Sequence, residues 1–561
     1  MVDITRRSAL GLVGGAMGLA GCQVLTDSDT PRRYSGQAAF NHGVASGDPQ
    51  SDRVILWTRV SIDNEGPVVD VSWQVFEDEK LSKKVRAGVV RTSEEQDYTI
   101  KVDVDGLNPA TEYFYNFTIQ TASAKMASPV GRTKTLAVGG EAPVRVAVVS
   151  CTNYPFGFFN VYDAISKRDE LDAVIHLGDY LYEYGIDAYG GKVGSELGRN
   201  HDPATEIITL KDYRRRHAQY KSEKSLQNAH ACAPWICTWD DHESANNAYR
   251  TGAENHDPTT EGTWTTRKQV AVQAYLEWMP VRDPVAGSTR SALWRSFDFG
   301  DVASIVCLET RLTGRSQEIS WETEMHNVAP EDVPNKVRGV MTRVNDSERT
   351  MLGHAQEAWL SQELTESVKA NKAWQVLANQ TIMARVNPPD FTKQLSADDK
   401  EAITDPRVIP FIEFSALGLP LNLDGWDGFP AARERLYSSA KQAGAQLITL
   451  TGDTHTAWAN RLVDKTGEPR GVEFGCTSVT SPGFGHYIPG VDNLGELFSD
   501  ANEDVVWHDP HGNGFTLIEL TSGDVKAAFF KVSAINEPEY TLAQVAEFRT
   551  QRDSGGVLED I

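Results

Sequence analysis

Four short motifs that carry metal-ligating side chains recur along the chain, each behind an apolar run. They are Ser150-Cys151, Gly178-Asp179 with Tyr182, Asp240-Asp241-His242-Glu243, and Gly452-Asp453-Thr454-His455. A Gly-Asp pair alone is commonly a turn, and an acidic cluster is often an exposed helix start. Their recurrence in this order brings thiolate, phenolate, imidazole and carboxylate donors together, which predicts a metal cluster.

Paired cations suit the hydrolysis of a negatively charged ester such as a phosphoester. Two ions roughly 3.5–4 Å apart neutralise the ester, bind the attacking hydroxide and stabilise the leaving oxygen. One carboxylate must bridge both ions, and Asp179 is the best placed candidate. The preceding Gly178 lets the backbone turn tightly beside the ions. Tyr182 follows three residues later and reaches the same ion if the segment coils into a turn.

The donors of this cluster differ in chemical kind. Thiolate and phenolate favour an oxidised, strongly Lewis-acidic iron over magnesium or calcium, although zinc also accepts a thiolate. Asp241 and Asp453 offer hard oxygen, which suits calcium, manganese or magnesium at a second position. The residues therefore predict two unlike ions and leave the identity of each open.

Buried strands are expected to position these motifs. Continuous apolar runs at 144–149, 173–177, 304–308, 374–377 and 446–450 are typical of strands covered on both faces. They alternate with helical or polar sequence, which predicts an α/β domain with active residues at the carboxyl ends of its strands. Residues 185–210, 252–266 and 386–428 look like loops, and the last is long enough to wall or cover a site.

Residues 38–136 follow a different pattern, with short runs of alternating polar and apolar residues between turns. This pattern predicts an all-β sandwich domain. Residues 107–115 resemble the fibronectin type III signature, in which a corner tyrosine ties one strand to the preceding loop. We expect a spacer or shield, with carbohydrate binding as the alternative. A linker at 138–143 leads to the α/β domain, assigned to 144–535, and to a tail at 536–561.

The chain is strongly acidic, with a net charge of -24 from 78 acidic and 54 basic residues. This charge argues against a nucleic-acid-binding surface, because phosphate backbones attract basic surfaces. It also argues against electrostatic steering of phosphorylated substrates, so a phosphate site needs bound cations. Solubility is the simplest explanation of the acidity itself.

Residues 1–22 have the features of an export signal. The pair Arg6-Arg7 precedes a Gly/Ala-rich apolar run at 9–21 that is too short to span a bilayer. Paired arginines indicate the twin-arginine export machinery, which carries folded, metal-loaded cargo. Residues 19–22 look like a lipoprotein box that would lipidate Cys22, with cleavage and release as the alternative. We therefore expect a periplasmic or cell-surface protein, held at the membrane only by a lipid anchor.

The order of the four motifs resembles that of the PhoD-type alkaline phosphatase family, within the calcineurin-like metallophosphoesterases. Further blocks similar to the family lie at 40–49, 57–59, 213–221, 226–230 and 424–429. The resemblance covers nearly the whole chain. It implies a four-layer α/β/β/α metallophosphoesterase sandwich behind an N-terminal, fibronectin III-like β-sandwich.

The resemblance also implies a ligand set. An Fe(3+) ion would be held by Cys151, Asp179, Tyr182 and His455. Asp179 would bridge to a second ion, expected to be Ca(2+) with Mn, Mg or Zn as alternatives. That ion would also be bound by Asp241 and Asp453, with Asn247 or Asn246 as an outer ligand.

Other positions take expected roles from the same resemblance. His242 would contact the phosphate or protonate the leaving group. Arg311 is the second residue expected to act in catalysis, in support of the site. Glu309 stands where the family usually has Asp, and Asn379 stands where it usually has Gln, beside Gln380. These departures leave Glu309, Asn379 and Gln380 without a firm role.

The implied activity is hydrolysis of phosphomonoesters or phosphodiesters by a metal-bound hydroxide, which releases phosphate. The expected partners are small phosphate esters, and also phospholipid headgroups or cell-wall polymers. A phospholipase D-like or teichoic-acid diesterase is therefore an alternative of the same chemistry. A non-catalytic surface lipoprotein that binds metal is the alternative from a different class.

Overall fold

The structure, a computed structural model, describes residues 23–25, 31–64, 66–285, 287–396, 400–401, 403, 408–488 and 491–561. The export signal expected at residues 1–22 lies outside this range. Within the range, no helix combines the length and the apolar character needed to cross a membrane.

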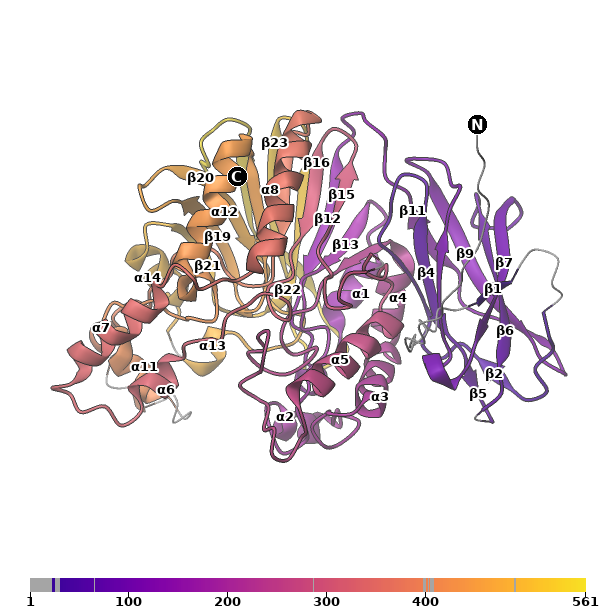
Figure 1. Ribbon diagram of the computed structural model, residues 1–561, viewed down its shortest axis with the longest axis horizontal. Coiled ribbons are helices and arrows are strands. Elements are labelled where there is room, and N and C mark those ends of the chain that lie inside the picture. The colour runs from indigo at the N-terminus through magenta and orange to yellow at the C-terminus, as the bar shows by residue number, and fades with distance from the viewer. Residues whose placement is uncertain are drawn as a thin grey trace, which may run out of the picture.

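Two large mixed β-sheets form the centre of the molecule (Figure 1). The first has ten strands, which are, from edge to edge, β25 (Glu559–Asp560), β24 (Leu542–Gln551), β23 (Asp524–Val532), β22 (Asn513–Leu520), β12 (Val144–Val149), β13 (Ala173–His176), β14 (Trp235–Cys237), β3 (Val44–Gly47), β4 (Val54–Arg59) and β8 (Thr99–Val104). The second has seven strands, which are β15 (Arg295–Phe299), β16 (Ala303–Cys307), β17 (Trp374–Ala378), β18 (Leu447–Thr451), β20 (Pro469–Gly475), β19 (Ala457–Val463) and β21 (Val505–Asp509).

Strand β12 shows why its apolar run is continuous. Val146 and Val148 lie in the core between the two sheets, whereas Ala147 and Val149 lie in the core under the helices. Successive side chains of a strand point to opposite faces, so a strand covered on both sides is apolar at every position. The five strands predicted from such runs are all present, with bounds that differ by at most one residue.

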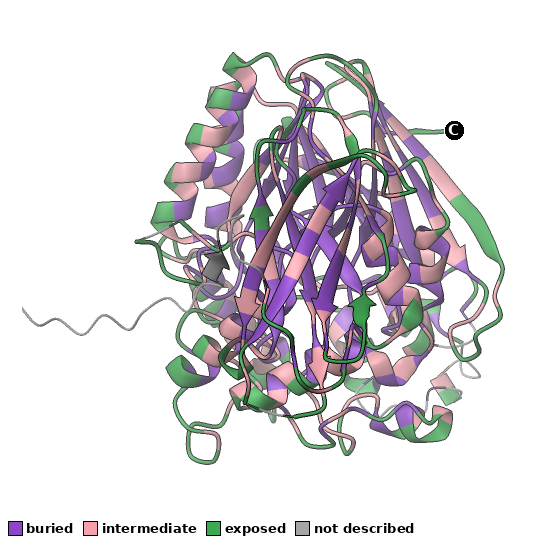
Figure 2. Cartoon of the chain, turned by 90° about the vertical axis from the view of Figure 1, so that its right-hand side faces the viewer, coloured by how far each residue is buried: buried purple, intermediate pink, exposed green. Residues whose placement is uncertain are grey.

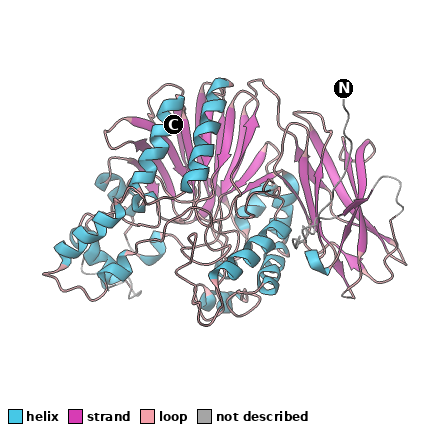
Figure 3. Ribbon diagram, viewed as in Figure 1, coloured by secondary structure: helices cyan, strands magenta, loops and turns pink. Residues whose placement is uncertain are grey.

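Helices cover the outer face of each sheet (Figure 3). The core outside the ten-stranded sheet includes residues of α1 (Asn160–Ser166), α3 (Leu210–Lys221), α4 (Lys224–Cys232) and α5 (Trp264–Trp278). The core outside the seven-stranded sheet includes residues of α8 (Gly353–Lys369), α12 (Pro430–Ala443) and α14 (Leu494–Ala501). The segments expected as loops carry further short helices, which are α2 (Gly191–Leu197), α9 (Phe391–Gln394) and α11 (Val408–Ser415).

The N-terminal β-domain shares the ten-stranded sheet with the rest of the chain. Its strands β3, β4 and β8 pack against a second sheet, which consists of β1 (Gln23–Leu25), β7 (Lys84–Thr92), β6 (Val69–Phe76), β9 (Glu112–Gln120), β10 (Lys125–Ala127) and β11 (Gly131–Lys134). In Figure 2, buried residues gather on the strands of this domain and exposed ones on the connecting loops. The corner tyrosine makes the expected contact, since the Asn108 backbone N–H donates to the Tyr113 hydroxyl at 2.8 Å.

The junction between the two domains is therefore a strand pair as well as a linker. Strand β3 runs parallel to β14, with Gly47 opposite Trp235, and the Asp48 backbone N–H donates to the Trp235 carbonyl at 3.0 Å. The buried Asp48 also forms an ion pair with the partly buried Arg295 of the seven-stranded sheet, at 2.7 Å. The β-domain is thus built onto the edge of the central sheet.

The segment at 536–561, expected as a tail, is in fact part of the ten-stranded sheet. Strand β24 pairs with β23 over its whole length, from Leu542 opposite Val532 to Gln551 opposite Asp524. Its first four residues are exposed, and only Phe548 and Thr550 are buried. A strand so close to the sheet edge needs little apolar sequence, which is why the pattern of the sequence did not reveal it.

Candidate metal centre

The carboxyl ends of four central strands meet in one region of the molecule. Cys151 follows β12, Asp179 follows β13, Asp241 follows β14, and Asp453 and His455 follow β18. Backbone hydrogen bonds tie the first two ends together, because the Cys151 N–H donates to Gly178 at 3.1 Å and the Thr152 N–H donates to Asp179 at 2.8 Å. Neighbouring parallel strands thus deliver these side chains to a single edge, as the sequence predicted.

The backbone at these strand ends is strained. Cys151, Asp179, Asp453 and His455 have φ angles of 60°, 55°, 64° and 60°, in the left-handed region that non-glycine residues rarely occupy. Each such residue costs on the order of 1–3 kcal/mol, and such strain clusters at functional sites. At Gly178, with φ of 107°, a Cβ would lie 2.4 Å from the Asp240 nitrogen, so no side chain fits there.

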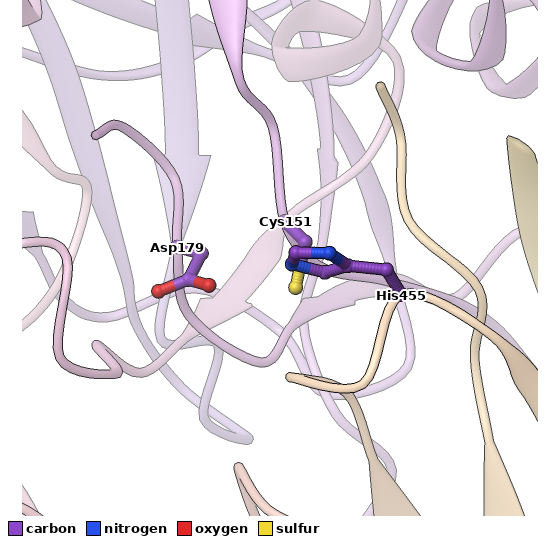
Figure 4. Close-up of side chains that lie close together, drawn as sticks. All are labelled: Cys151, Asp179 and His455. Atoms are coloured by element: carbon purple, nitrogen blue, oxygen red, sulfur yellow. The ribbon is translucent and has the colours of Figure 1, made fainter. Parts of the chain in front are cut away.

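Four donors of four chemical kinds converge at one end of the site. The thiol of Cys151, a carboxylate oxygen of Asp179 and a ring nitrogen of His455 lie within 4.8 Å of one another (Figure 4). The Tyr182 hydroxyl is 3.1 Å from Asp179 Oδ2 and 3.1 Å from His455 Nε2. The Pro482 carbonyl lies 3.0 Å from His455 Nδ1, so Nε2 is the nitrogen that faces the group. The structure therefore brings together all four residues expected to hold the first ion.

A second group consists of carboxylates around one arginine. Oxygens of Asp240, Asp241 and Asp453 lie within 4.8 Å of one another. The fully buried guanidinium of Arg311 pairs with Asp240, with Asp453 at 3.4 Å and with Asp241 at 3.7 Å. It also pairs with Asp424 at 2.7 Å.

Arg311 was expected to act in catalysis, yet it is not among the residues that line the cavity of the site. Its side chain is 0% exposed and its ion pairs all go to aspartates of the cluster. The structure therefore places Arg311 beneath the carboxylates, where it holds their geometry. Glu309 fixes the loop that carries it, since its carboxylate accepts the backbone N–H groups of Arg311 at 3.0 Å and Leu312 at 2.6 Å.

The electrostatics of this cluster suit bound cations. Burial raises the pKa of Asp179 well above its usual value, and the nearby Asp241 raises it further, although His242 opposes this shift. Burial and the neighbouring Asp240 and Asp424 raise the pKa of Asp453 in the same way, against the effect of Arg311. Asp241 Oδ1 is buried and has no hydrogen-bond partner in the described part of the chain. It faces the Arg311 guanidinium only at 3.7 Å, beyond hydrogen-bond distance. A buried carboxylate oxygen that accepts no hydrogen bond is costly unless a cation meets it closely, so these residues fit a metal site.

His242 lines the cavity beside the first donor group. Its ring stacks on that of Tyr182 with centroids 4.2 Å apart, and its Nδ1 lies 2.7 Å from the carboxylate of Glu183. Burial alone would lower the pKa of His242, but Glu183, Asp241 and Asp179 raise it well above the usual value. His242 therefore stands in the cavity as one half of a histidine–carboxylate pair.

Glu183 lies at the candidate site but was not predicted from the sequence. It is fully buried, and besides His242 it accepts the backbone N–H of Asn246 at 2.7 Å and the side-chain amide of Asn255 at 2.9 Å. The sequence did place Glu183 next to an expected ligand, because it directly follows Tyr182 in the same motif. Nothing in the sequence, however, indicated that it faces His242.

The outer-ligand candidates divide into two sets. Asn246 and Asn247 line the cavity, and their side-chain amides both donate to Glu254 at 2.8 Å. Asn379 and Gln380 instead make internal hydrogen bonds. Asn379 Oδ1 accepts from the Trp426 indole at 3.2 Å, and Gln380 Oε1 accepts from the Thr310 hydroxyl at 2.6 Å.

Members of both donor groups line one cavity of about 210 Å³, namely Asp179 and His455 of the first group and Asp241 and Asp453 of the second. The segment 386–428 forms part of its wall, as expected from its length. The lining residues from this segment are Val386, Leu421, Asn422, Asp424, Gly425 and Asp427. Asp424 was missed as a site residue, because it reaches the cluster from a loop with no strand directly before it.

Comparison with known proteins finds relatives over most of the chain. Residues 146–529 match the family model "PhoD-like phosphatase", and residues 26–137 match "PhoD-like phosphatase, N-terminal domain". The chain is 34% identical over 539 residues to alkaline phosphatase D of Bacillus subtilis (strain 168), covering 92% of this chain and 82% of that protein. It also matches the solved structure of PhoD with a TM-score of 0.76 and 32% identity, over 95% of this chain and 93% of that one.

These matches extend over both domains and over the strand ends that carry the metal-binding motifs. They confirm the family that the order of the motifs suggested. The chain belongs to the PhoD-like phosphatase family and is therefore a hydrolase that acts on phosphoester bonds.

Proposed function

We propose that the protein is an exported, metal-dependent phosphoesterase that hydrolyses phosphomonoesters or phosphodiesters. The observation that carries this proposal is the convergence of Cys151, Asp179, Tyr182 and His455 beside an acidic cavity. The mixture of thiolate, phenolate, imidazole and carboxylate is a metal-binding set, and the cavity has room for a phosphate group.

The ligand chemistry supports two unlike ions. Cys151, Asp179, Tyr182 and His455 would hold iron(III), since thiolate and phenolate stabilise an oxidised metal. Asp241 and Asp453, with Asp179 and Asn247, would hold calcium or another hard cation. When bound, the ions supply Lewis acidity that offsets the charge of the ester and makes water more acidic.

His242 is the side chain that we propose contacts the substrate. Glu183 holds its Nδ1 at 2.7 Å, so Nε2 is the nitrogen that serves the ester oxygen. The histidine either donates a hydrogen bond to the phosphate or protonates the leaving alcohol. Arg311 then acts as a positioning residue, since it contacts the aspartates and does not line the cavity.

We also propose that the chain has the detailed domain architecture expected from the family resemblance. The order of helices, ten-stranded sheet, seven-stranded sheet and helices supports a four-layer metallophosphoesterase sandwich. The corner tyrosine Tyr113 supports a fibronectin III-like N-terminal domain.

Hydrolysis and metal removal test the activity. Metal-loaded protein should cleave p-nitrophenyl phosphate or bis(p-nitrophenyl) phosphate, and a chelator should abolish this activity. Asp179→Asn should lower kcat by about a thousandfold or more, because the amide carries no charge for two ions. Asp464→Asn, at an ion pair with Arg470 outside the site, is the matched control and should retain activity. If the metal-loaded protein cleaves neither ester between neutral and alkaline pH, the enzyme proposal fails and a metal-binding lipoprotein becomes the better account.

Metal identity has a spectroscopic signature. Native protein should contain iron by elemental analysis and show a visible absorption band from Tyr182-to-iron charge transfer. Tyr182→Phe should remove the band, whereas Tyr184→Phe, two residues along the same segment, should keep it. A colourless, iron-free and fully active enzyme would refute the iron assignment.

The pairing of Glu183 with His242 can be tested by a double-mutant cycle. Glu183→Ala should lower kcat about 10- to 100-fold, in the range typical of residues that orient a functional histidine. In a His242→Ala background the same change should have little further effect, because its role passes through the histidine. Glu183→Gln keeps an acceptor oxygen and should restore part of the rate. Glu206→Gln, on the same Asn255 amide but away from His242, is the control. Fully additive losses would show that Glu183 acts elsewhere.

The proposed export and lipid anchoring rest on the sequence of residues 1–22. Replacing Arg6 and Arg7 by lysine should block export and leave the protein inside the cell. Cys22→Ala should release exported protein from the membrane fraction, because the lipid anchor is lost. Export of the double-lysine variant at the normal rate would exclude the twin-arginine route.

A further inference from the structure

A second cavity adjoins the candidate metal centre. It encloses about 390 Å³ and shares Thr454, His455 and Phe484 with the acidic cavity. Its remaining lining residues are Tyr189, Val408, Phe411, Pro482, Gly483, Tyr487 and Ile488. The two cavities therefore meet at the imidazole of His455, one of the expected metal ligands.

The chemical character of this second cavity is opposite to that of the first. Among the described residues, its lining contains no Asp, Glu, Lys or Arg side chain, whereas the first cavity is lined by five aspartates. Polar groups of its lining make hydrogen bonds within the protein. Tyr189 shares a side-chain hydrogen bond with Tyr487, and His455 Nδ1 faces the Pro482 carbonyl at 3.0 Å. A charged or strongly hydrated group would lose its hydration here without replacement, so the cavity suits an apolar group.

Four separate segments build the walls of this apolar cavity. Tyr189 comes from the loop after Asp179, Val408 and Phe411 from α11, His455 from the loop after β18, and Phe484 from α13 (Phe484–Tyr487). Phe411, Phe484 and Tyr487 are only partly buried against the neighbouring core. Apolar surface left open beside a polar reaction site is typical of a substrate pocket.

The surroundings of the metal centre are asymmetric. On the side of Asn247, a third cavity of about 510 Å³ is polar, with Glu254, Glu318 and Arg343 among its lining residues. On the side of His455 lies the apolar cavity. A phosphate held between these two cavities would direct one ester substituent toward apolar residues and another toward polar residues.

We propose that the apolar cavity binds an alkyl or aryl group that the substrate carries as an ester on its phosphate. The inference rests on the proposed function, since it needs the phosphate to sit at the metal centre. The substrate class is then a phosphate ester with one apolar substituent, which enters past His455 and contacts Phe411 and Phe484.

Binding of n-alkylphosphonates to the metal-loaded protein tests this inference without turnover. Titration calorimetry should show that hexylphosphonate binds about tenfold or more tightly than methylphosphonate, because each buried methylene adds affinity. 5-Aminopentylphosphonate has a similar length but a cationic end, and should bind no more tightly than methylphosphonate. Equal affinities for all three ligands would overturn the inference.

A pair of variants on one helix locates the binding. Phe411→Asp should bring the hexyl-to-methyl affinity ratio close to one, and Phe411→Ser should lower it if the aspartate variant does not fold. Ile409→Asp is the matched control, because Ile409 is exposed on the same helix and outside the cavity. It should retain both the wild-type ratio and the wild-type rate on p-nitrophenyl phosphate.

The two proposals fail in different ways. Hydrolysis of p-nitrophenyl esters with affinities that do not depend on chain length would leave the phosphoesterase standing and remove the apolar subsite. A wild-type ratio that survives in Phe411→Asp would also remove it, because the chain would then bind elsewhere.

Discussion

The guanidinium of Arg311 pairs with four aspartates in the interior of this protein, and much of the surrounding structure positions these side chains. Buried negative charge is costly unless it is paired, and one arginine cannot neutralise four carboxylates. Arg315 supplies a second cation to Asp424. Asp241 Oδ1, which accepts no hydrogen bond and lies 3.7 Å from Arg311, marks where further positive charge is needed. The proposed metal ions would satisfy that need and would let an acidic cavity accept an anionic ester.

The rigid strands of the fold hold these charged side chains in place. The strands that end at the site are covered by the opposite sheet on one face and by helices on the other. Residues just after these strands adopt left-handed backbone conformations that only a rigid frame sustains. Glu243 reinforces the frame, because its buried carboxylate accepts the backbone N–H groups of Asp179, Tyr180 and Asp240. The result is a set of donors fixed before any ligand arrives, which is what catalysis by preorganised charge requires.

The sequence predicted what depends on local pattern. Apolar runs located the central strands, and the motifs at their ends located Cys151, Asp179, Tyr182, Asp453 and His455, because parallel strands must bring their ends together. It did not predict contacts that depend on how distant loops pack. Asp424 reaches Arg311 across 113 residues of sequence, and Glu183 reaches His242 across 59. The sequence also did not predict strand β24, because a strand near the sheet edge needs few apolar residues. Nor did it predict the pairing of β3 with β14, because a single residue pair produces no recognisable apolar pattern.

The central claim is that the buried carboxylates are arranged for cations. The most direct measurement compares the melting temperatures of wild-type protein and Asp179→Asn, each metal-loaded and metal-free. We expect a reversal of sign: the asparagine variant melts lower than wild type with metal, because a ligand is lost, and higher without metal, because a buried charge is removed. A variant that melts lower than wild type in both states, with no loss of wild-type stability on metal removal, would contradict it.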